Sequence, residues 1–355
     1  MRRVIVALLV SLCIASCATL GGRSGKKAKA GNLDIYFLDM SGGASTLIVT
    51  PSGESVLIDT GSLEPKDRDA GRIYRATQAA GLKQIDHLVT THFHSDHFGG
   101  LLALSKMIPI KAFYDKGALA PAEDKDQTER LYPLYREATR GRVAEIKPGD
   151  DMPLRSDPAG RIPFVRLHCV AAEKKVEGFD GDVDGRIAGF DIRQPDSGDN
   201  ARSIALVLTY GKFRCFMGGD ITWNMEHHLA QPKNIIGKVD LYQVTHHGMD
   251  LSNNPLLMRA LSPTVCVAMN GPRKGIQPAT FRTLQELPGM QAIYQIHYNK
   301  QYGDRGNAPP EFIANMNDPS KGEFIKVAVN AREGCFTVSI GANGFKKTYR
   351  IQEKE

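Results

Sequence analysis

The chain has 355 residues, of which 42% are hydrophobic and 24% are charged, as is usual for soluble globular proteins. The formal net charge of +6 is modest, and six lysines and arginines precede residue 30, so the charge gives little support to nucleic-acid binding. Beyond the N-terminal segment, about 325 residues remain, which is enough for one large domain or two small ones.

The N-terminus has the pattern of an export signal. Two arginines precede an apolar run at 4–14, which is too short to span a bilayer. The segment Ile14-Ala15-Ser16-Cys17 resembles the lipobox of bacterial lipoproteins, whose cysteine becomes the lipidated first residue. We therefore expect a signal peptide at 1–17, a flexible basic linker at 18–31 and a lipoprotein held on the periplasmic side of the outer membrane by acyl chains. The alternative is an ordinary secretory signal cleaved nearby.

Strand-like and helix-like segments alternate along the rest of the chain. The first half predicts strands at 33–38, 45–49, 56–58 and 85–90 and helices at 69–82 and 96–107. The second half predicts strands at 164–171, 203–210, 213–216, 241–245, 264–268, 324–329 and 335–340, with helices at 222–230, 255–261 and 280–287. This order is typical of the α/β class.

Two stretches interrupt that alternation. Residues 117–142 are charged and helical, with Pro133 inside, and residues 178–200 are rich in glycine and aspartate. We interpret both as insertions or a cap over a site, because loops of this kind usually carry selectivity. Four widely spaced cysteines lie in strand-like segments and are interpreted as buried small hydrophobic residues: Cys169, Cys215, Cys266 and Cys335.

The most specific motif follows the predicted strand at 85–90 and contains three histidines and one aspartate. Its residues are His92, His94, Asp96 and His97. His92 and His94 are two residues apart at a strand end, so both imidazoles leave on one face and can bind one metal ion. Asp96 and His97 point elsewhere and can bind a second ion. Imidazole and carboxylate ligands suit zinc or a similar divalent ion, with coordination positions left for water.

Two later segments place further ligand types at strand ends. Asp220 follows Gly218-Gly219 beyond one predicted strand, and the pair His246-His247 follows another. Each segment alone is weak, since an aspartate after two glycines is usually a turn residue and a histidine pair is usually structural. Together with residues 92–97 they predict a metal site assembled from several strand ends.

These segments, with Asp59 in the run at 57–61, resemble the metallo-β-lactamase superfamily of metal hydrolases. More narrowly, the segments at 200–208, 219–220, 246–248 and 252–253 are similar to the hydrolase domain of ComEC-type DNA-uptake competence proteins. The resemblance covers residues 33 to 300 and implies an αββα sandwich with two metal ions between the sheet edges. The chain has no polytopic channel region, so we expect a stand-alone relative whose hydrolase domain spans 32–355.

The resemblance also implies roles for individual residues. His92 and His94 would bind the first metal, Asp96 and His97 the second, and Asp220 would bridge the two. One of His246 and His247 would complete the second site, and His246 is favoured because it lies nearer the strand end. Asp59 matches the carboxylate that orients a ligand imidazole.

One position departs from the superfamily pattern. Most members supply another histidine to the first metal where this chain has Asp199-Asn200, so Asn200 is a candidate ligand or a contact of one. His168, on a neighbouring strand, is a rival, although a structural histidine is the favoured interpretation. The first-metal site is therefore the less complete of the two.

The expected cofactor is a pair of divalent metal ions, with zinc expected and manganese as the alternative. Two such ions lower the pKa of a shared water towards neutrality, and Asp96 and Asp220 are the expected catalytic carboxylates. The predicted reaction is hydrolysis of a phosphodiester by a phosphodiesterase or nuclease, with DNA as one candidate substrate. The alternatives are a carbonyl substrate (a lactam, lactone or thioester) and a non-catalytic metal-binding lipoprotein. No protein partner is inferred.

The run at 270–275 is a candidate substrate-binding loop. Its backbone amides and the side chains of Asn270, Arg273 and Lys274 can bind a phosphate, while the alternative is a solvated turn. His297 is a candidate acid for the leaving group, against the alternative of a structural histidine.

Overall fold

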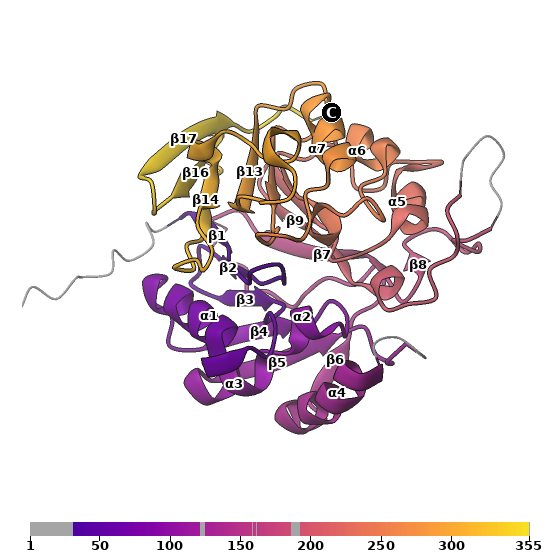
Figure 1. Cartoon of the computed structure of the whole chain (residues 1–355), viewed down its shortest axis with the longest axis vertical. Coiled ribbons are helices and arrows are strands. Elements are labelled where there is room, and N and C mark those ends of the chain that lie inside the picture. Colours follow the sequence, from indigo (N-terminus) through magenta and orange to yellow (C-terminus); the bar gives the residue numbers. More distant parts are fainter. Residues whose placement is uncertain (1–30, 121–124, 158, 161, 186–191, 355) are drawn as a thin grey trace, which may run out of the picture.

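A computed structural model describes residues 31–120, 125–157, 159–160, 162–185 and 192–354. The predicted signal peptide, Cys17 and almost all of the basic linker lie outside these residues. Most of the described chain forms two sheets that face each other, with helices on both outer faces (Figure 1). The prediction of an αββα sandwich is therefore confirmed.

The first sheet has nine strands. In spatial order these are β17 (Phe345–Arg350), β16 (Cys335–Ile340), β15 (Ile325–Asn330), β1 (Leu33–Phe37), β2 (Thr46–Val49), β3 (Ser55–Ile58), β4 (Ile85–Val89), β5 (Ile110–Asp115) and β6 (Val143–Glu145). The strands from β17 to β3 pair antiparallel, whereas β3 to β6 pair parallel. The parallel strands of this sheet therefore end at one edge.

The second sheet has eight strands. In spatial order these are β14 (Ile313–Asn315), β13 (Ala292–His297), β12 (Val265–Ala268), β11 (Leu241–Gln243), β10 (Phe213–Met217), β9 (Ala205–Tyr210), β7 (Val165–Ala172) and β8 (Lys175–Val176). The run from β10 to β14 is parallel. This sheet, too, gathers the carboxyl ends of several strands at one edge.

Helices cover the outer faces. The first sheet carries α1 (Arg68–Ala79), α2 (Ser95–Phe98), α3 (Leu101–Met107) and α4 (Lys125–Thr139). The second carries α5 (Trp223–Ala230), α6 (Pro255–Leu261) and α7 (Pro278–Gln285). Among the described helices, none has both the length and the apolarity needed to cross a membrane.

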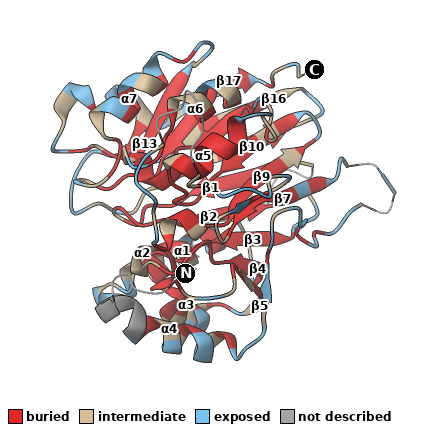
Figure 2. Ribbon diagram, turned by 90° about the vertical axis from the view of Figure 1, so that its right-hand side faces the viewer, coloured by how far each residue is buried: buried red, intermediate tan, exposed pale blue. Residues whose placement is uncertain are grey.

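The alternation of side chains along the strands explains these layers. Ile35 and Phe37 of β1 point into the core between the sheets, while Tyr36 packs on the helical side. On β9, Leu206 and Leu208 face the same central core and Val207 faces the other helices. Strands with apolar residues on both faces must be covered on both sides, and Figure 2 shows them buried.

The structure departs from the predicted elements in two instructive places. The helix expected at 96–107 is divided into α2 and α3 at Gly99-Gly100, where a Cβ on Gly100 would lie 2.2 Å from the carbonyl oxygen of Thr60. The glycine pair thus lets the loop after β3 pack against the histidine motif. In the stretch interpreted as an insertion, α4 buries Leu131 and Tyr135 in the core that includes Phe93. This helix is therefore part of the outer layer.

Candidate metal centre

The predicted ligand segments all follow strands at the shared edge of the two sheets. Residues 92–97 follow β4, and Asp59 follows the neighbouring β3. Asp220 follows β10, and the short 3-10 helix η3 (Thr245–Gly248) follows the parallel β11. Parallel strands end at the same edge of a sheet, so four segments that are far apart in sequence converge there.

Asp220 lies at the centre of the cluster. Its Oδ2 atom is 3.2 Å from Nε2 of His97, 3.3 Å from Nε2 of His247 and 3.5 Å from Nε2 of His246. Side chains from both sheets therefore converge on one carboxylate oxygen. This is the arrangement that a bridging ligand requires.

Asp96 forms the other pole of the cluster. Its Oδ2 atom lies 3.5 Å from Nε2 of His247 and 3.9 Å from Nε2 of His97, and it accepts a hydrogen bond from Nζ of Lys274 at 2.6 Å. Two groups of possible metal ligands result in the described part of the chain, one made of His92, His97 and Asp220 and the other of Asp96, His97 and His247. In each group the candidate ligand atoms lie within 4.8 Å of one another.

The remaining predicted ligands lie beside these groups. The His94 ring is 4.7 Å, centroid to centroid, from that of His92. His246 contacts Asp220, but the second group of possible ligands contains His247. Both histidines of the pair therefore face the centre, and His247 is the one that also reaches Asp96.

The hydrogen bonds around His92 test whether these residues fit a metal. The hydroxyl of Thr91 donates its one proton to Oδ2 of Asp59 at 2.8 Å, so it accepts from Nδ1 of His92 at 3.1 Å. His92 therefore carries its proton on Nδ1. Its Nε2 atom is fully buried, and the lone pair on this atom has no hydrogen-bond partner. A buried acceptor of this kind costs free energy unless something binds it. A divalent cation fits that position.

Asp59 orients a second ligand. Its Oδ2 atom accepts a hydrogen bond from Nδ1 of His97 at 2.8 Å, while its Oδ1 accepts from the backbone N–H of Thr91. With Nδ1 bonded to Asp59, the ring is oriented so that Nε2 of His97 is directed at Asp220. Asp59 itself has a left-handed backbone with φ of 62°.

The histidine pair is held in the same way, on strained backbone. Nδ1 of His247 lies 3.0 Å from the carbonyl oxygen of Met269, and Nδ1 of His246 lies 3.0 Å from the hydroxyl of Ser252. Both residues are left-handed, with φ values of 50° and 55°, a conformation that costs on the order of 1 kcal/mol or more for a non-glycine residue. Strain of this kind persists where surrounding contacts hold the residues in functional positions.

Electrostatics at the centre also favour a cation. Burial alone would raise the pKa of Asp220, but the imidazole of His97 holds it well below its usual range. Burial opposes ionisation of Asp96 as well, yet His97 and Lys274 keep its pKa well below 3.8. Burial would lower the pKa of His97, and the carboxylates of Asp220 and Asp59 raise it well above 6.5 instead. A proton on His97 thus supplies positive charge where a divalent ion would.

Asp199 lies where the resemblance implied a further histidine, and it supports the histidine motif through a backbone hydrogen bond. Oδ2 of Asp199 accepts a hydrogen bond from the backbone N–H of Phe93, between His92 and His94, at 2.6 Å. Its Oδ1 lies 2.9 Å from Nζ of Lys116, which is fully buried and also bonds Glu173. We name Lys116, Asp199 and the Phe93 amide the lysine clamp. Lys116 was not predicted as a site residue, since a lone lysine at a strand end carries no spacing signal.

The two other candidates for the first metal lie differently. His168 is engaged on both ring nitrogens, with Nδ1 2.7 Å from Asp151 and Nε2 2.8 Å from Glu177, which is the environment of a structural histidine. Asn200 follows Asp199 and has a buried Oδ1 without a hydrogen-bond partner. It does not belong to either group of possible metal ligands.

The four predicted substrate-binding residues have two different environments: two are charged and not buried, and two are buried. Lys274 reaches the centre through Asp96, and the exposed Arg273 lies 3.8 Å from Asp318. Asn270 is buried, and its side-chain amide bonds the carbonyl oxygen of His297 at 2.7 Å. Nε2 of His297 in turn lies 2.7 Å from Asp39. Asn270 and His297 thus hold the loop in place, whereas the side chains of Arg273 and Lys274 extend from it.

Comparison with known proteins supports the superfamily prediction. Residues 39–187 match the model of the metallo-beta-lactamase superfamily. This segment, less than half of the chain, is therefore similar to proteins of that superfamily. The matched segment includes Asp59 and the motif at 92–97, which supports the prediction of a metal-dependent hydrolase; members of that superfamily generally bind two metal ions. A comparison with curated proteins found no significant match.

Several solved structures resemble this chain at low identity. A mutant of the beta-hydroxylase CmlA, a diiron enzyme of Streptomyces venezuelae, is 17% identical over 74% of this chain and 52% of that protein, with a TM-score of 0.42. The chain thus spans about half the length of CmlA. A metal-dependent hydrolase from Parabacteroides distasonis is 15% identical over 75% of this chain and 95% of its own (TM-score 0.40). A diphosphatase of the PhnP family is 14% identical over 74% and 94% (TM-score 0.36).

Proposed function

We propose that the protein is a binuclear metal-dependent phosphodiesterase, with zinc as the expected metal and manganese as the alternative. The observation that carries this proposal is the positively charged side chain of Lys274 beside the candidate metal ligands. Nζ of Lys274 lies 2.6 Å from Asp96, so a positive side chain accompanies the two groups of possible metal ligands. A phosphodiester carries a negative charge, and such a site suits it better than it suits a neutral lactam or lactone.

The candidate ligands form two sets, each of which would hold one metal ion. His92, with its orphaned Nε2, His94 and Asp220 would hold one ion; Asp96, His97 and His247 would hold the other, with Asp220 shared. When bound, such ions supply Lewis-acid activation of water near neutral pH and neutralise charge on the attacked phosphate.

The chain's own groups position the reaction. Asp220 is fixed by imidazoles from both sheets, and its low pKa keeps it ionised. Asp96 is likewise ionised and partly exposed, so it can orient the attacking water by accepting a hydrogen bond from it. Lys274, whose side chain is 38% exposed, can donate hydrogen bonds to a non-bridging oxygen of the substrate.

Hydrolysis of bis-(p-nitrophenyl) phosphate, with metal content measured by elemental analysis, tests the proposal. We expect two equivalents of metal, cleavage that a chelator abolishes, and loss of cleavage in Asp220→Asn. Changing the structural histidine in His168→Gln is the matched control and should retain both metal and cleavage. Bound metal without cleavage would transfer the assignment to a carbonyl substrate, and absence of metal would favour a non-catalytic lipoprotein.

The ComEC-type resemblance makes DNA one candidate substrate. Single-stranded and double-stranded oligonucleotides labelled at one end would separate a nuclease from a small-molecule phosphodiesterase. Cleavage of the small diester with both oligonucleotides left intact would exclude the nuclease.

The place of action is proposed from the N-terminal sequence. The lipobox at 14–17 would direct the chain to the outer membrane as a periplasmic lipoprotein, held by acyl chains on Cys17. Substitution Cys17→Ser should release the protein from the membrane fraction. Unchanged fractionation would refute the lipobox assignment and leave the hydrolase proposal intact.

A further inference from the structure

A cationic cavity opens beside the metal centre, at the first turns of α1. Its volume is about 320 Å³. Five basic side chains line it: Lys66, Arg68, Arg72, Arg75 and Lys321. Arg68, Arg72 and Arg75 lie on α1, a helix of 12 residues, whose N-terminus adds the positive end of the helix dipole.

Ion pairs neutralise only part of this charge. Arg68 bonds Asp69 at 2.7 Å and Arg72 lies 3.1 Å from Asp39. By contrast, Lys66, Arg75 and Lys321 form no ion pair with any carboxylate of the described residues. Two acidic side chains also line the cavity. Asp318 is paired with Lys300 at 3.2 Å, whereas Asp67 is exposed. The cavity therefore keeps an excess of positive charge.

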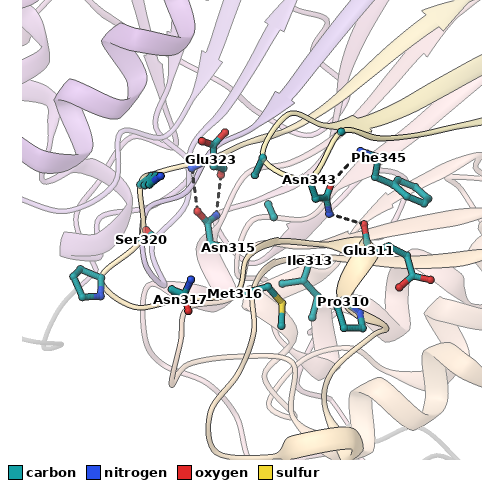
Figure 3. Close-up of a pocket in the computed structure, with 15 residues that line it drawn as sticks. Pro310, Glu311, Ile313, Asn315, Met316, Asn317, Ser320, Glu323, Asn343 and Phe345 are labelled. Carbon is teal, nitrogen blue, oxygen red and sulfur yellow. Dashed lines mark hydrogen bonds between the residues drawn. The ribbon is translucent and has the colours of Figure 1, made fainter.

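The far wall of the cavity is built by the loop at 316–322. Asn315 closes this loop by two hydrogen bonds to Glu323 (Figure 3). Ser320 accepts a hydrogen bond from the buried Arg72 at 2.7 Å. A Cβ on Gly322 would lie 2.6 Å from Arg72 and 2.7 Å from Arg75, so only glycine allows the loop to approach both guanidinium groups. The wall is thus ordered before any ligand binds.

Two short segments connect the cavity with the metal centre. Ser41 lines the cavity, and three residues later the N–H of Ala44 donates to the carbonyl oxygen of Asp96 at 3.1 Å. Three peptide units span at most about 11 Å. In the second segment Lys274 bonds Asp96, while its neighbour Arg273 pairs with Asp318 of the cavity. The candidate phosphate-binding loop thus runs between the two sites.

We propose that this cavity binds a second phosphate group of the substrate, located away from the bond that is cleaved. The inference rests on the proposed phosphodiesterase function and narrows its substrate to diesters that carry a further phosphate. Lys66, Arg75 and Lys321 are the cations without a carboxylate partner in the described part of the chain that can bind it, whereas Arg68 and Arg72 already have such partners; Arg75 also donates a hydrogen bond to the carbonyl oxygen of Lys321 at 3.3 Å.

Inorganic phosphate tests the cavity on its own. Titration of the metal-free protein, followed by calorimetry, should show binding that Arg75→Ala weakens by about tenfold, the usual effect of one exposed charge-assisted contact. The matched control is Arg282→Ala, an exposed arginine on α7 in the opposite helical layer. Absence of phosphate binding, or equal weakening by both variants, would overturn the proposal.

Two chromogenic diesters test the substrate assignment. The p-nitrophenyl ester of thymidine 5′-phosphate has one phosphate, and the same compound with a 3′-phosphate has two. With metal bound, we expect kcat/KM to favour the second compound by about tenfold, a preference that falls in Arg75→Ala and at high salt. Equal cleavage of both compounds would overturn the assignment. If neither is cleaved, the phosphodiesterase proposal fails, and the calorimetric titration alone still decides whether the cavity binds phosphate.

Discussion

The hydroxyl of Thr91 is predicted to control metal affinity although it touches no metal. It donates to Asp59 at 2.8 Å and accepts from Nδ1 of His92 at 3.1 Å. In Thr91→Val, a change of nearly equal volume, Asp59 loses one donor. Nδ1 of His92 must then either lose its hydrogen-bond partner or transfer its proton to Nε2. The second outcome removes the lone pair that faces the cluster.

The magnitude follows from these two contacts. Loss of a buried hydrogen-bond partner costs about 1–3 kcal/mol in the free energy of unfolding. Loss of the contact that orients a ligand typically reduces metal affinity by about 10- to 100-fold, which corresponds to about 1.4–2.7 kcal/mol. Both effects should appear in the same variant.

Competition with a chromophoric chelator measures the affinity, and urea denaturation of the metal-free protein measures the stability. The matched control is Thr77→Val on α1, where a buried hydroxyl donates to the carbonyl oxygen of Tyr74 at 2.8 Å. The control should lose stability and keep wild-type affinity. If Thr91→Val binds metal like the control, the reasoning about the His92 proton is refuted.

Three further outcomes are expected. His94→Ala should lose about one metal equivalent without unfolding, whereas elemental analysis of His168→Ala should show the full content. Lys116→Met should lower stability by about 3–5 kcal/mol because the buried Asp199 loses its cation, and Lys116→Arg should recover part of the loss in urea denaturation. Burial raises the pKa of Glu226 to about 7, so the folded state keeps a proton that the unfolded chain loses above pH 4.5. Between pH 4.5 and 7, Glu226 should therefore contribute a fall of roughly 3 kcal/mol to the stability of the metal-free protein, and Glu226→Gln should remove that contribution when the two urea-denaturation profiles are compared.

Elements with strong alternation or an amphipathic face were predictable. The apolar run of β1 and the helical spacing of α1 each gave an element with bounds close to those observed. The edge strand β17 was not predicted, because Phe345–Arg350 carries three charged residues and exposes most of its side chains. Its pairing with β16 depends on the hairpin and not on local apolar content. β13 was also missed, although its residues are buried.

At the centre, spacing along the chain predicted which residues converge but not how they are held. The residues of the motif at 92–97 are close together in the sequence, so the proximity of His92 and His97 could be expected. By contrast, Lys116 reaches Asp199 across 83 positions, and no local pattern reports such a contact. The histidine pair also lay beyond sequence reasoning, since the left-handed backbone of His246 and His247 turns both rings towards Asp220.

The charges on the two sites imply an order of binding. Asp96 and Asp220 are ionised at the centre, so without metal they repel a phosphodiester more than Lys274 attracts it. The α1 cavity has its own unpaired cations and needs no metal to attract phosphate. A substrate with two phosphates should therefore bind the metal-free protein through the distal phosphate only, and productive binding should require metal first. A diester with one phosphate is a monoanion and should bind the metal-free protein more weakly than the compound whose 3′-phosphate adds a dianionic group, so titrating both compounds with and without metal separates the contributions of the two sites.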